Sequence, residues 1–141
     1  MNNIKDEISN NDCAQICVSQ IDGKGRGVLA MTKIKNESVV EVAPLLLVPR
    51  DELLGTMLRE YCFSYKRDRS LSAIALGYAS LYNHAFEPNA KYSIKKNSVV
   101  ITACRDIEKG EEICIDYNWS PRKCYSKGLI TKEEFELMSE D

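Results

Sequence analysis

Short runs in which apolar and polar residues alternate, separated by turn-forming residues, dominate the first third of the chain. "AQICVSQI" (14–21) and "GVLAM" (27–31) have this pattern and flank the glycine-rich turn "DGKGRG" (22–27). "SVVEVAPLLLV" (38–48) is a longer β-branched run, and Pro49 ends it because proline has no amide donor. We predict a strand from each of the three apolar runs.

The segment that follows is less regular. Residues 50–60, "RDELLGTMLRE", have the spacing of a short helix, which Gly55 weakens because glycine is a poor helix former. "YCFSY" (61–65) is apolar and aromatic enough for a strand, and "KRDRS" (66–70) is a charged loop. The pattern predicts one poor helix and one short strand.

Strand signals return near residue 90. "AKYSI" (90–94), "SVVITA" (98–103) and "EEICIDY" (111–117) are rich in β-branched and aromatic residues, and polar turn-like segments separate them. The chain is therefore predicted to be mainly β, with short strands and little helix.

The C-terminal residues carry a helix-start pattern instead. In "ITKEEFELM", Thr131 is placed to cap a helix, and Glu134 is placed to reach back to that cap. Ile130 and Phe135 have the spacing of a hydrophobic staple across the first turn. We expect a short helix laid against the sheets.

Length and composition fit one compact domain. The chain has 141 residues, of which 44% are apolar, enough for a single core. The first residues are polar and have no periodicity. We expect a flexible tail over residues 1–12, one domain over residues 13–119, and an extension with the short helix over residues 120–141.

Apolar runs, cysteine spacing and charge argue against several classes of protein. No apolar run of about eighteen residues and no secretory signal occurs, so we expect a soluble intracellular protein, cytoplasmic or nuclear, with no membrane association. Six cysteines form no CxxC pair and only one histidine accompanies them, which favours free thiols and no bound metal. The net charge of −2 gives no sign of direct nucleic-acid binding.

Three stretches carry the candidate chemistry, and each also has a purely structural interpretation. "GKGRG" (23–27) reads as a hairpin turn. His84 in "SLYNHAFEPNA" is the only histidine, and a lone histidine is more often an internal hydrogen-bonding residue than a base or a metal ligand. Tyr117 ends a strand, ordinarily a core or rim position, although the run Asp-Tyr-Asn-Trp places a phenol, an amide and an indole together.

The order of these stretches is more specific than any one of them. "KGRGV", then "YASLYNHAFEPNA", then "GEEICIDY" resembles the SET-domain family of protein lysine methyltransferases over about residues 23–119. The small free-standing SET proteins of viruses and bacteria are the most similar members. The resemblance implies small, twisted, mostly antiparallel sheets with a threaded C-terminal segment. It also implies methyl transfer from S-adenosylmethionine (SAM) to a lysine side chain.

The resemblance further implies where SAM binds. In the family, the backbone of the glycine turn lies along the methionine end of SAM, which corresponds here to Lys24, Gly25, Arg26 and Gly27. The Asn-His pair of the NHxxxPN motif contacts the adenine, largely through backbone groups, and falls on Asn83 and His84. His84 would then shape the cofactor pocket, with its ring held by internal hydrogen bonds, and would not act as a base.

The remaining site residues are also implied by the family. Tyr117 matches the active-site phenol and is the implied catalytic residue, which aligns the lysine nitrogen with the methyl donor. Tyr61 matches an aromatic residue that lines the lysine channel in the small viral relatives. Trp119 is implied to cover the adenine or to close the channel. Ile115 stands where many nuclear members have phenylalanine or tyrosine, so more room would favour di- or trimethylation.

Two further features depart from the family pattern. Ala85 replaces the serine of NHS, and the zinc-binding cysteine cluster after the core is absent, since Cys124 stands alone. The expected partner is a lysine-containing protein, such as a histone or a ribosomal protein, and a homodimer is compatible with the resemblance. A non-catalytic SET-like module that binds a lysine-bearing partner stays open as an alternative, as does a small structural β-domain.

Overall fold

Two β-sheets form the body of the molecule. The computed structural model describes residues 15–139. The first sheet has the order β1-β2-β9-β6, and its strands are β1 (Ile16–Ile21), β2 (Gly25–Ala30), β9 (Glu112–Ile115) and β6 (Asn83–His84). Its pairs are antiparallel except β6 and β9, which run parallel. The last strand of the chain therefore lies between an early strand and a middle one.

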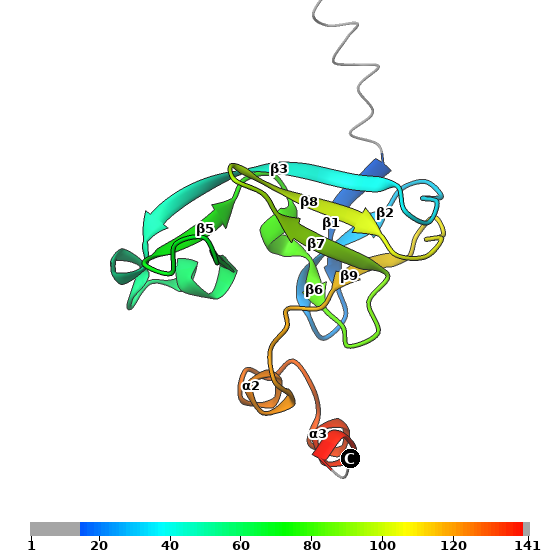
Figure 1. Ribbon diagram of the computed structural model, residues 1–141. Helices are drawn as coiled ribbons and strands as arrows, with labels where there is room; N and C mark the ends of the chain where they lie inside the picture. Colours follow the sequence, from blue (N-terminus) through cyan, green and yellow to red (C-terminus); the bar gives the residue numbers. More distant parts are fainter. Residues whose placement is uncertain (1–14, 140–141) are drawn as a thin grey trace, which may run out of the picture.

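The second sheet is antiparallel throughout, with the order β4-β5-β3-β8-β7. Long β3 (Val39–Pro49) is its central strand, and Figure 1 shows it running across the top of the molecule beside β8. The other four strands are β4 (Phe63–Ser64), β5 (Leu71–Ala75), β7 (Ala90–Ile94) and β8 (Ser98–Ala103). The mainly β fold expected from the sequence is confirmed.

Strand β9 is the most deeply buried strand of the first sheet. Ile113, Cys114 and Ile115 are all buried, in contrast to β8, where buried and half-buried residues alternate. A short strand that is buried on both faces has room for polar groups only at its ends. Glu112 and Tyr117 stand at or just beyond those two ends, and both are half-buried.

A buried asparagine fixes β9 in its place. The side-chain oxygen of Asn89 accepts a hydrogen bond from the amide of Cys114 at 2.9 Å, and its Nδ2 donates to the carbonyl of Glu112 at 2.8 Å. Asn89 is only 5% exposed. It occupies the last position of "NHAFEPN", so one role of that motif is to hold the strand that leads to Tyr117.

Most predicted strands are confirmed, with differences at their ends. β1, β3, β7 and β8 lie where alternation places them, whereas β2 begins at Gly25, before the predicted residues 27–31. β9 ends at Ile115, so Tyr117 lies beyond the strand. β5 is not among the predicted elements. The threading of the C-terminal segment stays a prediction.

The predicted helix over residues 50–60 is wrong in type. Two 3-10 helices occupy this region, η2 (Arg50–Leu53) and η3 (Met57–Tyr61). Gly55 between them has a φ of 77°, a left-handed conformation that an α-helix cannot contain. A third short 3-10 helix, η4 (Ala79–Leu81), precedes β6.

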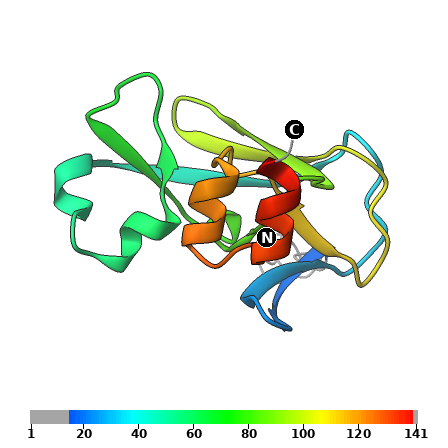
Figure 2. The same cartoon turned by 90° about the horizontal axis from the view of Figure 1, so that it is seen from below.

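The C-terminal extension contains two helices, α2 (Pro121–Ser126) and α3 (Lys132–Ser139), of which only α3 is predicted. The predicted capping box is confirmed. Glu134 accepts from the Thr131 amide at 2.7 Å, and the Thr131 hydroxyl accepts from the Glu134 amide at 3.2 Å. Figure 2 shows the two helices side by side. The predicted tail over residues 1–12 lies outside the described residues.

Candidate active site

Tyr117 lies just beyond β9, between two other aromatic rings. Its ring centroid is 5.2 Å from that of His84 and 5.2 Å from that of Trp119. Its hydroxyl donates a short hydrogen bond to the main-chain carbonyl of Tyr82. Burial raises the pKa of the Tyr117 phenol, and nearby ionisable groups such as Cys114 raise it further. The phenol is therefore protonated at neutral pH, with its one proton directed at a backbone carbonyl.

A first cavity, of about 420 Å³, lies on one side of Tyr117. Its wall brings together residues from β2, β6 and η3 that are far apart in the sequence. Among its lining residues are Lys24, Gly25, Arg26, Tyr61, Asn83 and Tyr117. Four of these six were expected beside SAM, so the structure assembles most of the cofactor residues that the resemblance implies around one hollow.

Glu112 organises the polar wall of this cavity. Its two carboxylate oxygens accept hydrogen bonds from Lys24 Nζ and from Asn83 Nδ2, each at 2.8 Å. Asn83 Nδ2 also lies 3.0 Å from the Arg26 carbonyl oxygen, to which it donates. The hydrogen bond to Glu112 raises the pKa of Lys24. Sequence reasoning missed Glu112, although its position at the polar start of an otherwise buried strand is a usable signal.

The two glycines of the β1–β2 turn that line or border this cavity are required for different reasons. Gly25 has a φ of 76°, and a Cβ built on it would meet nothing within 4 Å. Gly27 is buried, and a Cβ there would lie 2.7 Å from both Asn83 Nδ2 and Glu112 Oε2. Gly25 is thus needed for its backbone conformation, whereas Gly27 is needed for packing beneath the Glu112 network.

His84 places its ring inside the protein and its main chain nearer the surface. The side chain is 2% exposed, although the residue as a whole is half-buried. Nδ1 accepts a hydrogen bond from the Tyr117 amide at 3.0 Å, so the expected internal bond is confirmed for this nitrogen. Buried Nε2 has no hydrogen-bond partner among residues 15–139. Burial lowers the pKa of His84, against an opposing effect of Asp116, so the ring is neutral.

A second cavity, of about 70 Å³, also borders Tyr117, and aromatic residues make up much of its wall. Tyr61 and Tyr117 line both cavities, so the two spaces meet at this pair of rings. Ile115 lines the second cavity, as expected for a channel residue. Trp119 also lines the second cavity and is not part of the first cavity's wall, and its role in closing the channel or covering the adenine stays a prediction.

The carbonyl that accepts the Tyr117 hydrogen bond belongs to Tyr82, a buried residue with a hydrogen bond of its own. Tyr82 is 1% exposed, and its hydroxyl donates to Glu41 at 2.9 Å. Glu41 also accepts from the Tyr78 amide at 2.8 Å. Sequence reasoning missed this support, although a single acid inside the apolar run "SVVEVAPLLLV" is a sign of a buried polar contact.

Residues 15–139 contain no group of three or more His, Cys, Asp or Glu side chains that could hold a metal ion. The five cysteines in this range are free. Burial raises the pKa of Cys114 to about 11, which keeps its thiol protonated and unreactive. None of the helices in this range is long and apolar enough to cross a membrane.

Comparison with known sequences agrees with this geometry. The SET domain family matches residues 25–118. A Schizosaccharomyces pombe histone-lysine N-methyltransferase, specific for lysine 37 of histone H3, is 29% identical over 126 residues, which cover 83% of this chain and 84% of the relative. A potential protein lysine methyltransferase of Saccharomyces cerevisiae is 50% identical over 40 residues, which cover 28% of this chain and 11% of that protein.

Comparison with solved structures extends the agreement to three dimensions. A candidate histone methyltransferase of Plasmodium falciparum superposes with a TM-score of 0.66 and 29% identity, covering 75% of this chain and 95% of its own. A humanized mutant of the Chaetomium thermophilum Polycomb Repressive Complex 2 superposes with a TM-score of 0.61 and 22% identity, covering 73% of this chain and 15% of that chain. The second likeness concerns the fold alone.

Proposed function

Because the chain belongs to the SET-domain family and is a protein-lysine N-methyltransferase, we propose that Tyr117 aligns the reacting lysine where the two cavities meet. The observation that carries this proposal is the shared wall: Tyr61 and Tyr117 line both the polar first cavity and the aromatic second cavity. A methyl donor and a lysine amine that occupied one cavity each would face one another across these two rings. The non-catalytic binding module is not favoured.

We assign the first cavity to SAM, which SET methyltransferases use. When bound, SAM supplies a methyl group on a positively charged sulfur. Lys24 is already paired with Glu112, whereas Arg26 makes no ion pair with a carboxylate of residues 15–139. The guanidinium of Arg26 is therefore available to bind the carboxylate at the methionine end of SAM. Asn83 lines this cavity and His84 follows it in β6, so the main chain of this pair would receive the adenine.

The second cavity is suited to a neutral lysine side chain. A free lysine has a pKa near 10.4, and desolvation in this narrow cavity beside a positively charged sulfur would disfavour its charged form, against the opposing effect of Glu60 in the wall. The Tyr117 hydroxyl donates its hydrogen bond to the Tyr82 carbonyl. The lone pairs of the hydroxyl oxygen are therefore available to accept hydrogen bonds from the amine N–H groups. This contact directs the nitrogen lone pair along the line of attack, and alignment supplies most of the rate enhancement in a displacement of this kind.

The substrate is a lysine-containing protein. Which protein it is remains to be identified by experiment. The Schizosaccharomyces pombe relative carries the name of a histone H3 enzyme. We would therefore test histones and ribosomal proteins alongside the other proteins of cytoplasmic and nuclear extracts. A homodimer stays a prediction.

The test separates SAM binding from methyl transfer. Tyr117→Phe removes one hydroxyl and leaves the first cavity intact, so calorimetry should show SAM binding close to that of the unaltered protein. Transfer of labelled methyl groups to histones, ribosomal proteins and lysate should fall at least about a hundredfold, as expected when a group that orients the reacting atoms is lost. Equal rates for the two proteins would remove the role given to the phenol.

Arg26→Ala is the complementary variant, because it should weaken SAM binding and leave Tyr117 in place. We expect the dissociation constant of SAM to rise about tenfold, the loss of one charge-assisted contact. Lys35→Ala, an exposed cation outside both cavities, is the matched control. An absence of SAM binding by the unaltered protein would favour the binding-module alternative.

A further inference from the structure

A third cavity beside the aromatic channel is lined mainly by cations. We infer, on the basis of the proposed function, that this basic groove selects substrates in which acidic residues flank the target lysine. The groove has a volume of about 610 Å³ and contains five basic side chains against one carboxylate, Asp51. The cations are Arg50, Arg59, Lys66, Arg69 and Lys123.

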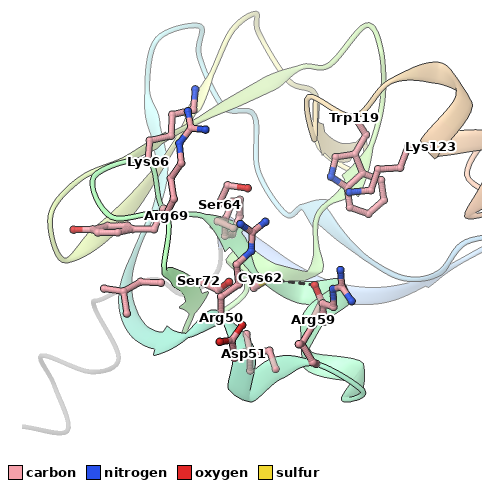
Figure 3. A pocket seen from close by; sticks show the side chains of 15 residues that line it. Arg50, Asp51, Arg59, Cys62, Ser64, Lys66, Arg69, Ser72, Trp119 and Lys123 are labelled. Carbon is pink, nitrogen blue, oxygen red and sulfur yellow. Dashed lines mark hydrogen bonds between the residues drawn. The ribbon is translucent and has the colours of Figure 1, made fainter.

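The cations come from four separate segments that fold toward one space. Arg50 and Arg59 belong to η2 and η3, Lys66 and Arg69 to the loop before β5, and Lys123 to α2. Figure 3 shows Lys66 with Arg69 on one side of the groove and Lys123 with Trp119 on the other, with Arg50 between them and Arg59 below Trp119. The charge is thus gathered by the fold, since the whole chain carries a net charge of −2.

These cations are available to a ligand. All five are exposed, and none forms an ion pair with a carboxylate of residues 15–139. Within that range, the charged group of Lys123 lies over the Trp119 ring, with Nζ 3.9 Å from the ring centroid. Elsewhere in the protein, Lys24, Arg105 and Lys127 all have carboxylate partners. The groove is therefore a concentration of uncompensated positive charge.

The groove adjoins the channel in which the lysine reacts. It shares four lining residues with the aromatic second cavity: Cys62, Phe63, Ser64 and Trp119. It shares none with the first cavity, which leaves the cofactor side separate. A substrate whose lysine enters the channel must lay neighbouring residues across this region, at about 3.3 Å per extended residue. Flanking residues within a few positions of the lysine would therefore meet the cations.

Charge complementarity decides which flanks fit. Glutamate and aspartate would gain attraction from several cations at once, and the approach of an acidic segment would be accelerated. Arginine and lysine at the same positions would meet like charge, so a segment as basic as a histone tail would bind poorly. The groove thus narrows the substrate class of the proposed enzyme to lysines in acidic surroundings.

The test is direct peptide binding, which does not depend on turnover. Three fluorescent peptides share one lysine and differ only in its flanks, which are glutamate, glutamine or arginine. Fluorescence anisotropy with S-adenosylhomocysteine present should show the glutamate peptide binding about tenfold more tightly than the glutamine peptide, and the arginine peptide more weakly still. Raising the salt concentration to about 0.5 M should remove most of this preference.

Charge reversal locates the effect. Arg50→Glu with Arg69→Glu should weaken binding of the glutamate peptide at least about tenfold and improve binding of the arginine peptide. Lys91→Glu with Lys109→Glu changes the net charge equally but outside the groove, and should leave the preference in place. Lys66→Glu alone is the fallback, because thermal unfolding will show whether the double variant folds.

Three outcomes overturn the inference: equal binding of the arginine and glutamate peptides, the same loss in the control variant, or tight binding of oligo(dT) without binding of the glutamate peptide. Methylation of the same peptides separates this inference from the proposed function. If peptides are methylated at the same rate whatever their flanking charge, the inferred selectivity of the groove is wrong, while the proposed methyl transfer still holds. If the glutamate peptide binds with the expected preference but Tyr117→Phe methylates it as fast as the unaltered protein does, the catalytic role of Tyr117 is wrong. The selectivity of the groove would still hold.

Discussion

Glu112 shows how single residues join distant parts of the chain into one site. It contacts Lys24, 88 positions earlier, and Asn83, 29 positions earlier, and it lies over buried Gly27. The motifs identify Lys24, Asn83 and Tyr117 as site residues, because each falls in a recognisable stretch. Glu112 also falls in such a stretch, "GEEICIDY", but its role depends on three-dimensional neighbours that strand alternation alone does not specify.

The buried ring of His84 predicts an acid-sensitive fold. Burial lowers its pKa in the folded protein below the unfolded value of about 6.5, so the unfolded chain takes up the proton first as the pH falls. Stability should therefore be complete above about pH 6.5 and decrease as the pH falls through the folded-state pKa. Protonation of Nδ1 also removes the acceptor for the Tyr117 amide.

Thermal unfolding between about pH 5 and pH 7.5 measures this effect. His84 is the only histidine of the chain, so His84→Gln should flatten the pH dependence of the melting temperature in that window. An unchanged slope in His84→Gln would assign the effect to other groups.

Ile115 predicts a product with more than one methyl group. Its side chain lines the second cavity, whose volume is only about 70 Å³, so a larger residue there removes space next to the amine. The unaltered enzyme should produce di- or trimethyl-lysine, and Ile115→Phe should shift the product toward monomethyl-lysine. Mass spectrometry of a methylated peptide counts the methyl groups, and Ile101→Val, a core change away from both cavities, is the control.

At the scale of elements, periodicity was a good guide wherever one face of a strand is buried. It located β1, β3, β7 and β8, but not the two-residue β6 or the parallel pairing of β6 with β9. A two-residue strand has no period, and its pairing is set by tertiary contacts. The 3-10 helices η2 and η3 escaped prediction because left-handed Gly55 interrupts a segment whose composition alone suits a helix.

The two hydrogen bonds from the Asn89 side chain to β9, which we call the β9 clamp, predict a large loss of stability for Asn89→Ala. This change leaves the Cys114 amide and the Glu112 carbonyl buried without side-chain partners, which should lower the free energy of unfolding by about 2–4 kcal/mol. Asn97→Ala, at an exposed turn with no side-chain hydrogen bond among residues 15–139, should cost less than about 0.5 kcal/mol. Urea denaturation of both variants checks the difference, and equal midpoints would contradict the clamp.

At the scale of the whole molecule, an exposed ion pair joins the C-terminal extension to the body. Lys127 Nζ lies 2.9 Å from a carboxylate oxygen of Glu60, and Glu60 lines both cavities beside Tyr117. Within the extension, the rings of Tyr125 and Phe135 stack with centroids 5.1 Å apart. We propose that residues 120–141 form an accessory unit held near the site, while residues 13–119 form the domain.

Lys127→Glu should loosen this extension without unfolding the domain. An exposed pair contributes at most about 1 kcal/mol, so the melting temperature should change little. Trypsin should cut the extension several-fold faster, because the unit spends more time detached. Lys132→Glu, which affects only the pair within α3, is the matched control. Identical digestion of both variants would show that Glu60 does not hold the extension.

The central position of β9 also determines at which stage of folding the active site forms. β9 pairs with β2 near the start of the described chain and with β6 in its middle, so the first sheet has a gap until the last strand is inserted. Contacts between residues so distant in sequence form late, because the intervening loop must close first. A nascent chain can therefore build the β3–β8 sheet before it has any place for a methyl donor. Catalytic competence should appear in the final step of folding, after synthesis has passed Tyr117.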